Sequence, residues 1–429
     1  MPALDRYGGL LRTAGSLMGT TIATSVLGAA YWWLAARLLP EATVGYGSAA
    51  ISAMSLIGTV GMLGLGTMLI GELEGGRKSE PGLITASLLT ASVASLVLAV
   101  GVTAFMAAGH REPFASGSWP MIAFFVVGSA VTGGSLVLDL ALIGLATGYL
   151  QLLRNTVFAA AKLALLFAVT PIWPGGHGLA VVAAWVAGLA VSMAVIGPRL
   201  WGRPLELRAR PDWPAFRRRR RATAAHNMFN VAGQLPRLTL PILATALISA
   251  RAGAAFYVVW LIMWFFYLIP NHLSTSLFAI GAGRENELRH QLNFSLRLSL
   301  AAGLVGCPLL IAAAHDILRI FGDGYAAQAT SAMRLLALAY LPMIVKTHYI
   351  SVIRVQQRLA RGSVIATIGA LLEIGAAAAG AEAAGITGLA TGVLVALVFE
   401  VVIMWTVVWR AATRPDVPDT PDVPNAVEA

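Results

Sequence analysis

The chain contains a long stretch without Asp, Glu, Lys or Arg: PGLITASLLTASVASLVLAVGVTAFMAAG, residues 81–109. A helix needs about 20 mostly apolar residues to cross the hydrocarbon core of a bilayer. The stretch exceeds that length, so it predicts a membrane-spanning helix.

The whole chain shares this character. Of its 429 residues, 58% are hydrophobic and 12% are charged, and the mean hydropathy is +0.76. A typical soluble domain has about 25% charged residues, and no water-soluble fold can bury so large an apolar share. The composition therefore predicts a polytopic membrane protein. It excludes disordered, collagen-like and disulfide-scaffold proteins.

Apolar segments of suitable length recur along the chain. They predict an all-α protein with about twelve transmembrane helices. The expected spans are residues 10–38, 44–70, 83–108, 119–144, 153–173, 178–198, 226–249, 253–280, 294–314, 329–347, 361–381 and 385–409.

The distribution of basic residues predicts the orientation. With the N-terminus in the cytoplasm and twelve alternating spans, the inner segments hold 23 of the 30 Lys and Arg residues. The outer loops hold three: Arg111, Arg251 and Arg319. Cytoplasmic loops of membrane proteins are enriched in Lys and Arg, so we expect both termini in the cytoplasm.

The longest inner loop, residues 199–225, contains five consecutive arginines, Arg217–Arg221. Such a cluster can bind lipid headgroups or nucleic acid, or act as a topology anchor between two halves. We favour the anchor and expect no nucleic-acid partner. The loop separates an expected six-helix bundle at residues 1–198 from a second at 226–410. The Pro- and Asp-rich tail at 411–429 cannot bury a core and is expected to be disordered.

Several signatures of catalysis and metal binding are missing from the sequence. It has no G-x-x-x-x-G-K-[ST] phosphate loop and no HExxH motif, and Cys307 is its only cysteine. We therefore expect no cofactor and no metal ion, and a protein that is not an enzyme.

Basic side chains inside the membrane are the strongest candidates for a substrate site, because such charges are costly and face protein or water. Arg237 and Lys162 are expected near mid-depth, Arg154 at the inner mouth of its helix and Arg12 at an inner gate. An ion pair with another helix is the alternative for Arg237 and Lys162. For Arg154 the alternative is contact with lipid headgroups.

Acidic residues inside the spans are Asp139, Glu373 and Glu400. Each is a candidate for coupling to protons or cations, or for neutralising the two mid-depth cations. Near the expected outer surface, Arg37 and Glu41 stand four residues apart. That spacing predicts a local ion pair.

Four residues are expected to bend their helices. Pro236 and Pro241 flank Arg237, and Pro270 lies in the eighth span. Proline lacks the N–H group that the helical ladder requires, and irregular backbone inside a membrane is tolerated where it lines a cavity. Gly64 belongs to a small-residue face of the second span, which serves either close helix packing or bending.

The N-terminal runs Gly15–Gly28 and Tyr31–Gly45, with Asp139, Ile143-Gly-Leu145 and Arg154-Asn155, resemble bacterial polysaccharide-biosynthesis membrane proteins. These are the O-antigen and lipid-linked oligosaccharide flippases of the multidrug/oligosaccharidyl-lipid/polysaccharide (MOP) exporter superfamily. The resemblance is best over residues 10–165. It implies a MATE-like architecture, with two six-helix bundles around a central cavity in a bacterial-type cytoplasmic membrane.

This resemblance implies a flippase that moves a lipid-linked saccharide across the membrane for cell-surface polysaccharide synthesis. Such a substrate carries a phosphate or pyrophosphate, which needs a shielded cationic path, and Arg237 and Lys162 fit that requirement. The implied partners are a lipid-linked oligosaccharide, the bilayer, and a polysaccharide polymerase or glycosyltransferases. A proton- or cation-coupled drug antiporter of the same architecture is the alternative. A membrane-embedded polymerase or ligase is a weaker one, because the outer loops are short.

Overall fold

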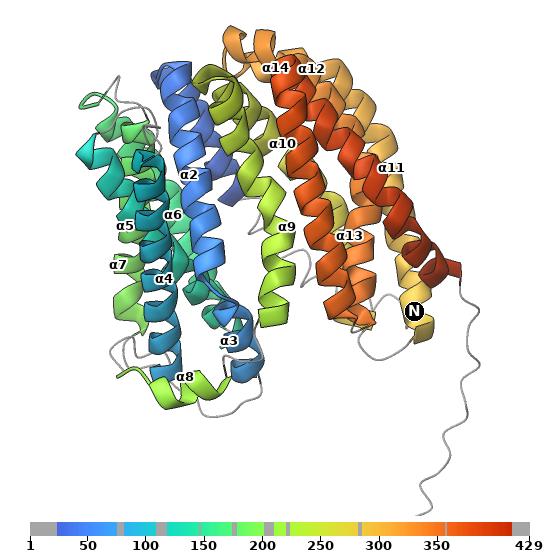
Figure 1. Cartoon of the computed structure of the whole chain (residues 1–429), viewed down its shortest axis with the longest axis horizontal. Coiled ribbons are helices and arrows are strands. Elements are labelled where there is room, and N and C mark those ends of the chain that lie inside the picture. The colour runs from blue at the N-terminus through green and yellow to red at the C-terminus, as the bar shows by residue number, and fades with distance from the viewer. Residues whose placement is uncertain are drawn as a thin grey trace, which may run out of the picture.

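The computed structural model describes residues 24–74, 81–108, 118–145, 147–173, 178–200, 210–219, 224–281, 285–356 and 358–413. Within these ranges every regular element is a helix (Figure 1). The uninterrupted apolar runs explain this, because a helix satisfies all its backbone hydrogen bonds internally and needs no water to do so. Arg12 and most of the tail, including residues 414–429, lie outside the described residues.

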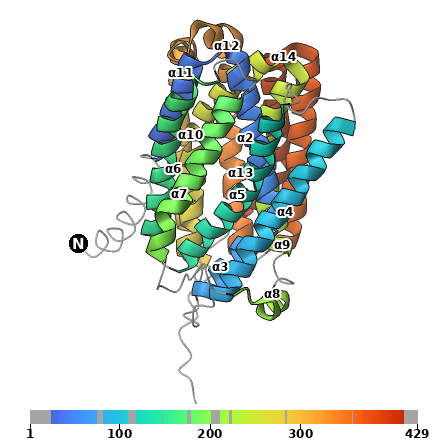
Figure 2. The same ribbon diagram turned by 90° about the vertical axis from the view of Figure 1, so that its left-hand side faces the viewer.

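The N-terminal helices, here called the first bundle, occupy the left side of Figure 1. The bundle begins with a helix at residues 24–38. It continues with α2 (Glu41–Gly61), α3 (Leu65–Glu74), α4 (Pro81–Ala108), α5 (Trp119–Gly144), α6 (Gly148–Val169) and α7 (Leu179–Leu200). The short helix α8 (Trp213–Arg219) lies across one end of this bundle, beside α3 (Figure 2).

The C-terminal helices form the second bundle. They are α9 (Ala224–Leu243), a π-helical turn η3 (Ala244–Ile248), α10 (Ala250–Gly281), α11 (Glu285–Arg319), α12 (Asp323–Leu338), α13 (Tyr340–Val355) and α14 (Leu359–Thr413). Helix α9 packs against both α14 and α2, and thereby joins the two bundles.

The helices account for the expected number of spans. Among the described residues, nine helices are long and apolar enough to cross a membrane, or ten if the bent pair α12 and α13 is one span. Helix α14 counts once in that number, although its backbone breaks at Ala384 and Gly385, between the expected spans 361–381 and 385–409. Counting α14 as two helices and adding the helix at residues 24–38 gives twelve.

The second span is divided in two. Helix α2 ends at Gly61 and α3 begins at Leu65, while Leu63 and Gly64 between them adopt positive φ angles of 51° and 75°. That conformation is favourable for glycine and costly for leucine. The break therefore lies at Gly64, where the sequence suggested bending.

Polar contacts between the bundles gather at the end that the charge pattern predicts to be outside. Trp33 Nε1 and Arg37 Nη2 both donate to the carbonyl oxygen of Ile320, at 3.1 and 2.7 Å. Glu41 accepts a hydrogen bond from Gln328 Nε2 at 3.1 Å and lies 3.8 Å from Arg251 Nε. Arg37 and Glu41 thus contact the second bundle instead of forming the local ion pair with each other that their spacing predicted.

The two halves of α14 fold back on each other through small residues. A Cβ atom built on Gly380 would collide with the carbonyl group of Gly388, and one on Gly392 would collide with that of Ala376. Both contacts require glycine, because the two backbones touch. At the turn, Gly385 adopts a φ of +59°, which a side chain would disfavour.

We expect Gly380→Ala to lower the free energy of unfolding by about 1–3 kcal/mol, the usual cost of forcing extra atoms into a packed interface. Gly375, on the same helix half, has open space around its Cβ position. Gly375→Ala should therefore leave stability unchanged or raise it by up to about 1 kcal/mol, because alanine favours helix. Thermal unfolding of the purified variants in detergent measures both. Equal melting temperatures would contradict the close approach.

Candidate functional site

A cavity of about 280 Å³ lies between the two bundles and is here called the central cavity. The helix at residues 24–38, α2, α6 and α7 line it from the first bundle, and α9 and α10 line it from the second. Among the described residues that line it, the charged ones are Lys162 and Arg237, and none of them is a carboxylate. The structure therefore brings the two mid-depth cations of the sequence to one site, each from a different bundle.

Arg237 reaches the central cavity from α9. Its guanidinium carbon lies 4.7 Å from the ring centre of Trp264, and its carbonyl oxygen accepts a hydrogen bond from Trp260 Nε1 at 3.0 Å. Its buried Nε has no hydrogen-bond partner among the described residues. A buried donor without a partner is costly, so this N–H is available to an acceptor brought by a ligand.

Lys162 reaches the cavity from α6 and is only 5% exposed. Its Nζ lies 4.1 Å from the ring centre of Trp185, 4.7 Å from that of Phe158 and 5.0 Å from that of Tyr31. These distances are in the range of cation–π contacts. Within the described residues, none of the ion pairs involves Lys162.

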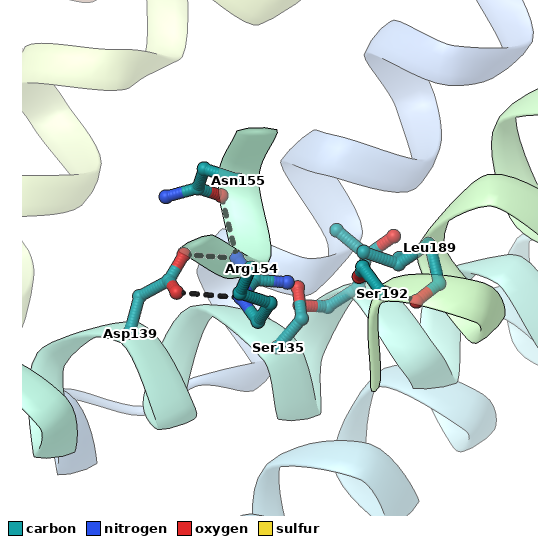
Figure 3. A network of polar contacts seen from close by, with 7 residues as sticks. Ser135, Asp139, Arg154, Asn155, Leu189 and Ser192 are labelled. Atoms are coloured by element: carbon teal, nitrogen blue, oxygen red, sulfur yellow. Dashed lines mark hydrogen bonds and ion pairs between the residues drawn. The ribbon is translucent and has the colours of Figure 1, made fainter. Parts of the chain in front are cut away.

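Asp139 and Arg154 form a bidentate ion pair away from the central cavity (Figure 3). Arg154 Nε on α6 donates to Asp139 Oδ1 on α5 at 2.8 Å, a second bond joins Nη2 to Oδ2, and Nη2 also donates to Asn155 Oδ1 at 2.9 Å. Arg154 is 3% exposed, so it is buried in protein. It is not among the residues that line the central cavity.

Glu373 and Glu400 meet Lys346 in the second bundle. Lys346 Nζ on α13 contacts Glu373 on the first half of α14 and lies 3.0 Å from Glu400 Oε2 on the second half. Lys346 lies near the end of the expected span 329–347, and the structure places it, almost buried, within α13. The acids expected to neutralise Lys162 or Arg237 therefore pair with other cations.

The expected bending residues lie at different kinds of position. Helix α9 continues through Pro236 and Pro241, and the π-helical turn η3 follows Pro241, whose carbonyl oxygen accepts a hydrogen bond from Thr245 Oγ1 at 3.1 Å. Pro270 lies inside α10 without ending it. Arg237 therefore lies in regular helix, and the irregular backbone begins at Ala244, directly after α9 ends.

Sequence reasoning missed the aromatic lining of the central cavity. The residues are Trp32, Trp185, Tyr257, Trp260, Trp264 and Phe265. Their flat faces suit packing against the C–H faces of a ring-shaped substrate, and their N–H and O–H groups can bond its polar edge. Trp260 and Trp264 stand four residues apart, which places them on one helix face, and that spacing was the available signal.

A second, larger cavity of about 620 Å³ adjoins the first and is here called the apolar groove. The residues that line it are almost all apolar and include Val26, Leu268 and Ile269. Ser25 and Phe265 line both spaces, so the groove and the central cavity are neighbours.

Comparisons with known proteins agree on the fold. The MatE family model matches residues 235–378, about a third of the chain. An inward-facing multidrug resistance MATE transporter of the MOP superfamily matches with 14% identity and a TM-score of 0.70, over 91% of this chain and 94% of that chain. A Vibrio cholerae MATE transporter has 13% identity and a TM-score of 0.66, over 94% of this chain and 97% of its own.

A MOP-superfamily transporter from Pyrococcus furiosus, reported with a binding pocket of reverse polarity, is also similar in fold. It has 13% identity and a TM-score of 0.59, over 94% of this chain and 95% of that chain. At these identities the likeness shows the fold. No curated protein matches the sequence.

We expect Arg154→Ala to lower the free energy of unfolding by about 3–5 kcal/mol, because it leaves the Asp139 carboxylate without its partner inside the protein. Arg154→Ala combined with Asp139→Ala should recover part of the loss, since no charge then stays unpaired. The matched control is Arg297→Ala, an exposed arginine on α11, expected within about 0.5 kcal/mol of wild type. If Arg154→Ala lost no more stability than the control Arg297→Ala, the ion pair would not be stabilising.

Proposed function

We propose that the protein is a transporter that moves a lipid-linked saccharide with a phosphate or pyrophosphate headgroup across the cytoplasmic membrane, for cell-surface polysaccharide synthesis. The observation that supports this most is the central cavity, where Lys162 and Arg237 face one space and no carboxylate of the described part of the chain lines it. Two uncompensated cations in a site shielded from bulk water favour an anion.

The chemistry of the cavity suits a sugar phosphate. A guanidinium donates N–H groups in a fixed fork that matches phosphate oxygens, and Arg237 Nε is buried without a partner. The aromatic lining offers faces for the sugar rings. Headgroup and saccharide would thus bind together between the two bundles.

The apolar groove suits the lipid part of the same substrate. It adjoins the central cavity through Ser25 and Phe265. A hydrocarbon tail gains free energy from an apolar surface, whereas a water-soluble substrate would leave this groove unused. A lipid-linked anion would occupy both spaces at once.

Transport would follow from alternate opening of the two ends. The contacts of Arg37 and Glu41 with the second bundle hold the predicted outer end together.

As the energy source for transport, we propose proton or cation coupling at Glu373 and Glu400. Two carboxylates face the single ammonium of Lys346, so a proton or a monovalent cation would neutralise the remaining charge.

A small-molecule antiporter is the second candidate, because the fold is shared with a multidrug resistance transporter. Such a protein would take up an organic cation or drug in exchange for protons, and it would not need the apolar groove.

On the flippase proposal, the partners are glycosyltransferases that build the lipid-linked saccharide and a polymerase that consumes it. A membrane-embedded polymerase or ligase remains the weakest candidate.

Arg237→Gln and Lys162→Gln should each slow the transbilayer movement of a fluorescent lipid-pyrophosphate-sugar about tenfold or more in proteoliposomes. A hydrogen bond to a charged group contributes about 1.5–3 kcal/mol, which corresponds to that factor. Arg334→Gln is the matched control: this arginine lies in a span but is exposed, and its Nε donates to Ile311 O at 3.2 Å. Flipping no faster than in empty vesicles, together with proton-driven uptake of an organic cation, would favour the antiporter.

Glu400→Gln should abolish any acceleration of flipping by an imposed pH gradient, since it removes one of the two carboxylates around Lys346. Glu382→Gln, a change of an exposed acid on α14, should leave the acceleration intact. The measurement compares initial flipping rates with and without the gradient. Acceleration that persists in Glu400→Gln would overturn the coupling role.

A further inference from the structure

Lys162 is held by three aromatic rings that come from three helices. Tyr31 belongs to the helix at residues 24–38, Phe158 to α6 and Trp185 to α7. All three ring centres lie within 5.0 Å of Lys162 Nζ. An ammonium surrounded by several aromatic faces is the arrangement with which proteins bind quaternary ammonium ligands.

The rings hold one another in place. Trp185 meets Phe158 edge to face, with centroids 5.0 Å apart, and Tyr31 in the same manner at 5.9 Å. The hydroxyl of Tyr31 donates to the carbonyl oxygen of Val181 at 2.8 Å, which fixes its ring. The three residues therefore form a preformed cage, and the lysine side chain does not need to organise it.

The backbone at Lys162 is closely packed as well. A Cβ atom on Gly188 of α7 would lie 2.9 Å from the backbone nitrogen of Lys162, so α6 and α7 pack closely at this point. The ammonium is therefore held at the cage by its own side chain, which is anchored to a closely packed backbone. A tethered group competes with a free ligand as if it were present at millimolar concentration or more.

We infer that Tyr31, Phe158 and Trp185 form an organic-cation site that the chain's own Lys162 fills, and that this occupancy makes the central cavity select anions. An organic cation entering the cavity meets both Lys162 and Arg237 and finds the aromatic cage occupied. An anion meets the same two charges as partners. Lys162 thus determines substrate charge in two ways, by attracting anions and by blocking the cage.

This inference deepens the proposed function by naming what sets its substrate class, but its test needs no saccharide. Lys162→Ala empties the cage and removes the charge. We expect it to bind tetramethylammonium at least tenfold more tightly than wild type, measured by isothermal titration calorimetry in detergent, with sodium chloride at equal concentration as the salt control.

Two further variants separate the cage from a simple loss of charge. Lys162→Met removes the charge but keeps the space filled, so it should gain no affinity for tetramethylammonium. Phe158→Leu added to Lys162→Ala replaces one ring by an aliphatic side chain and should weaken binding severalfold. If Lys162→Ala does not fold, Lys162→Ser opens the same space.

The inference is overturned if the emptied cage binds tetramethylammonium no better than wild type, or if Lys162→Met gains as much as Lys162→Ala. These results are independent of flipping. A chain that flips no lipid-linked saccharide but gains cation binding in Lys162→Ala would lose the proposed function and keep the cage.

Discussion

The structure depends on one constraint: a charge inside a hydrocarbon layer must find a counter-charge, an aromatic face or a water-filled space. Asp139 and Arg154 meet it as a pair within the first bundle, and Lys346 meets it between Glu373 and Glu400 within the second. Of the candidate buried charges in the part of the chain that the structure describes, Lys162 and Arg237 then remain without an ionic partner. They face the space between the bundles, which is why the unpaired charge and the cavity coincide.

The division of the site between two bundles connects binding with movement. Lys162 and Trp185 belong to the first bundle, whereas Arg237, Trp260 and Trp264 belong to the second. A ligand that contacts both sets of residues stabilises the arrangement of the two bundles in which both sets can reach it. Only such differential contacts allow a ligand to shift a conformational equilibrium. The charged pairs inside each bundle do not line the central cavity, so they do not contact such a ligand directly.

The sequence predicted the helices far better than their partners. Long apolar runs determine spans locally, and the short gap at 382–384 matches the break in α14 at Ala384 and Gly385. Ion pairing is different, because it depends on which helices are neighbours. The sequence therefore offered Lys162 or Arg237 as partners for Glu373, whereas its observed partner is Lys346, near the end of the expected span 329–347. A buried acid pair allows that lysine inside the bundle.

The closure between the bundles at Ile320 consists of hydrogen bonds from Trp33 and Arg37, with a long ion pair at Glu41 nearby. Arg37 and Trp33 are exposed, so water can replace each bond when the bundles part. Each such exchange changes the free energy by only about 0.5–1.5 kcal/mol. Together these hydrogen bonds contribute only a few kcal/mol to the closure, an amount comparable to the differential binding of one charged headgroup.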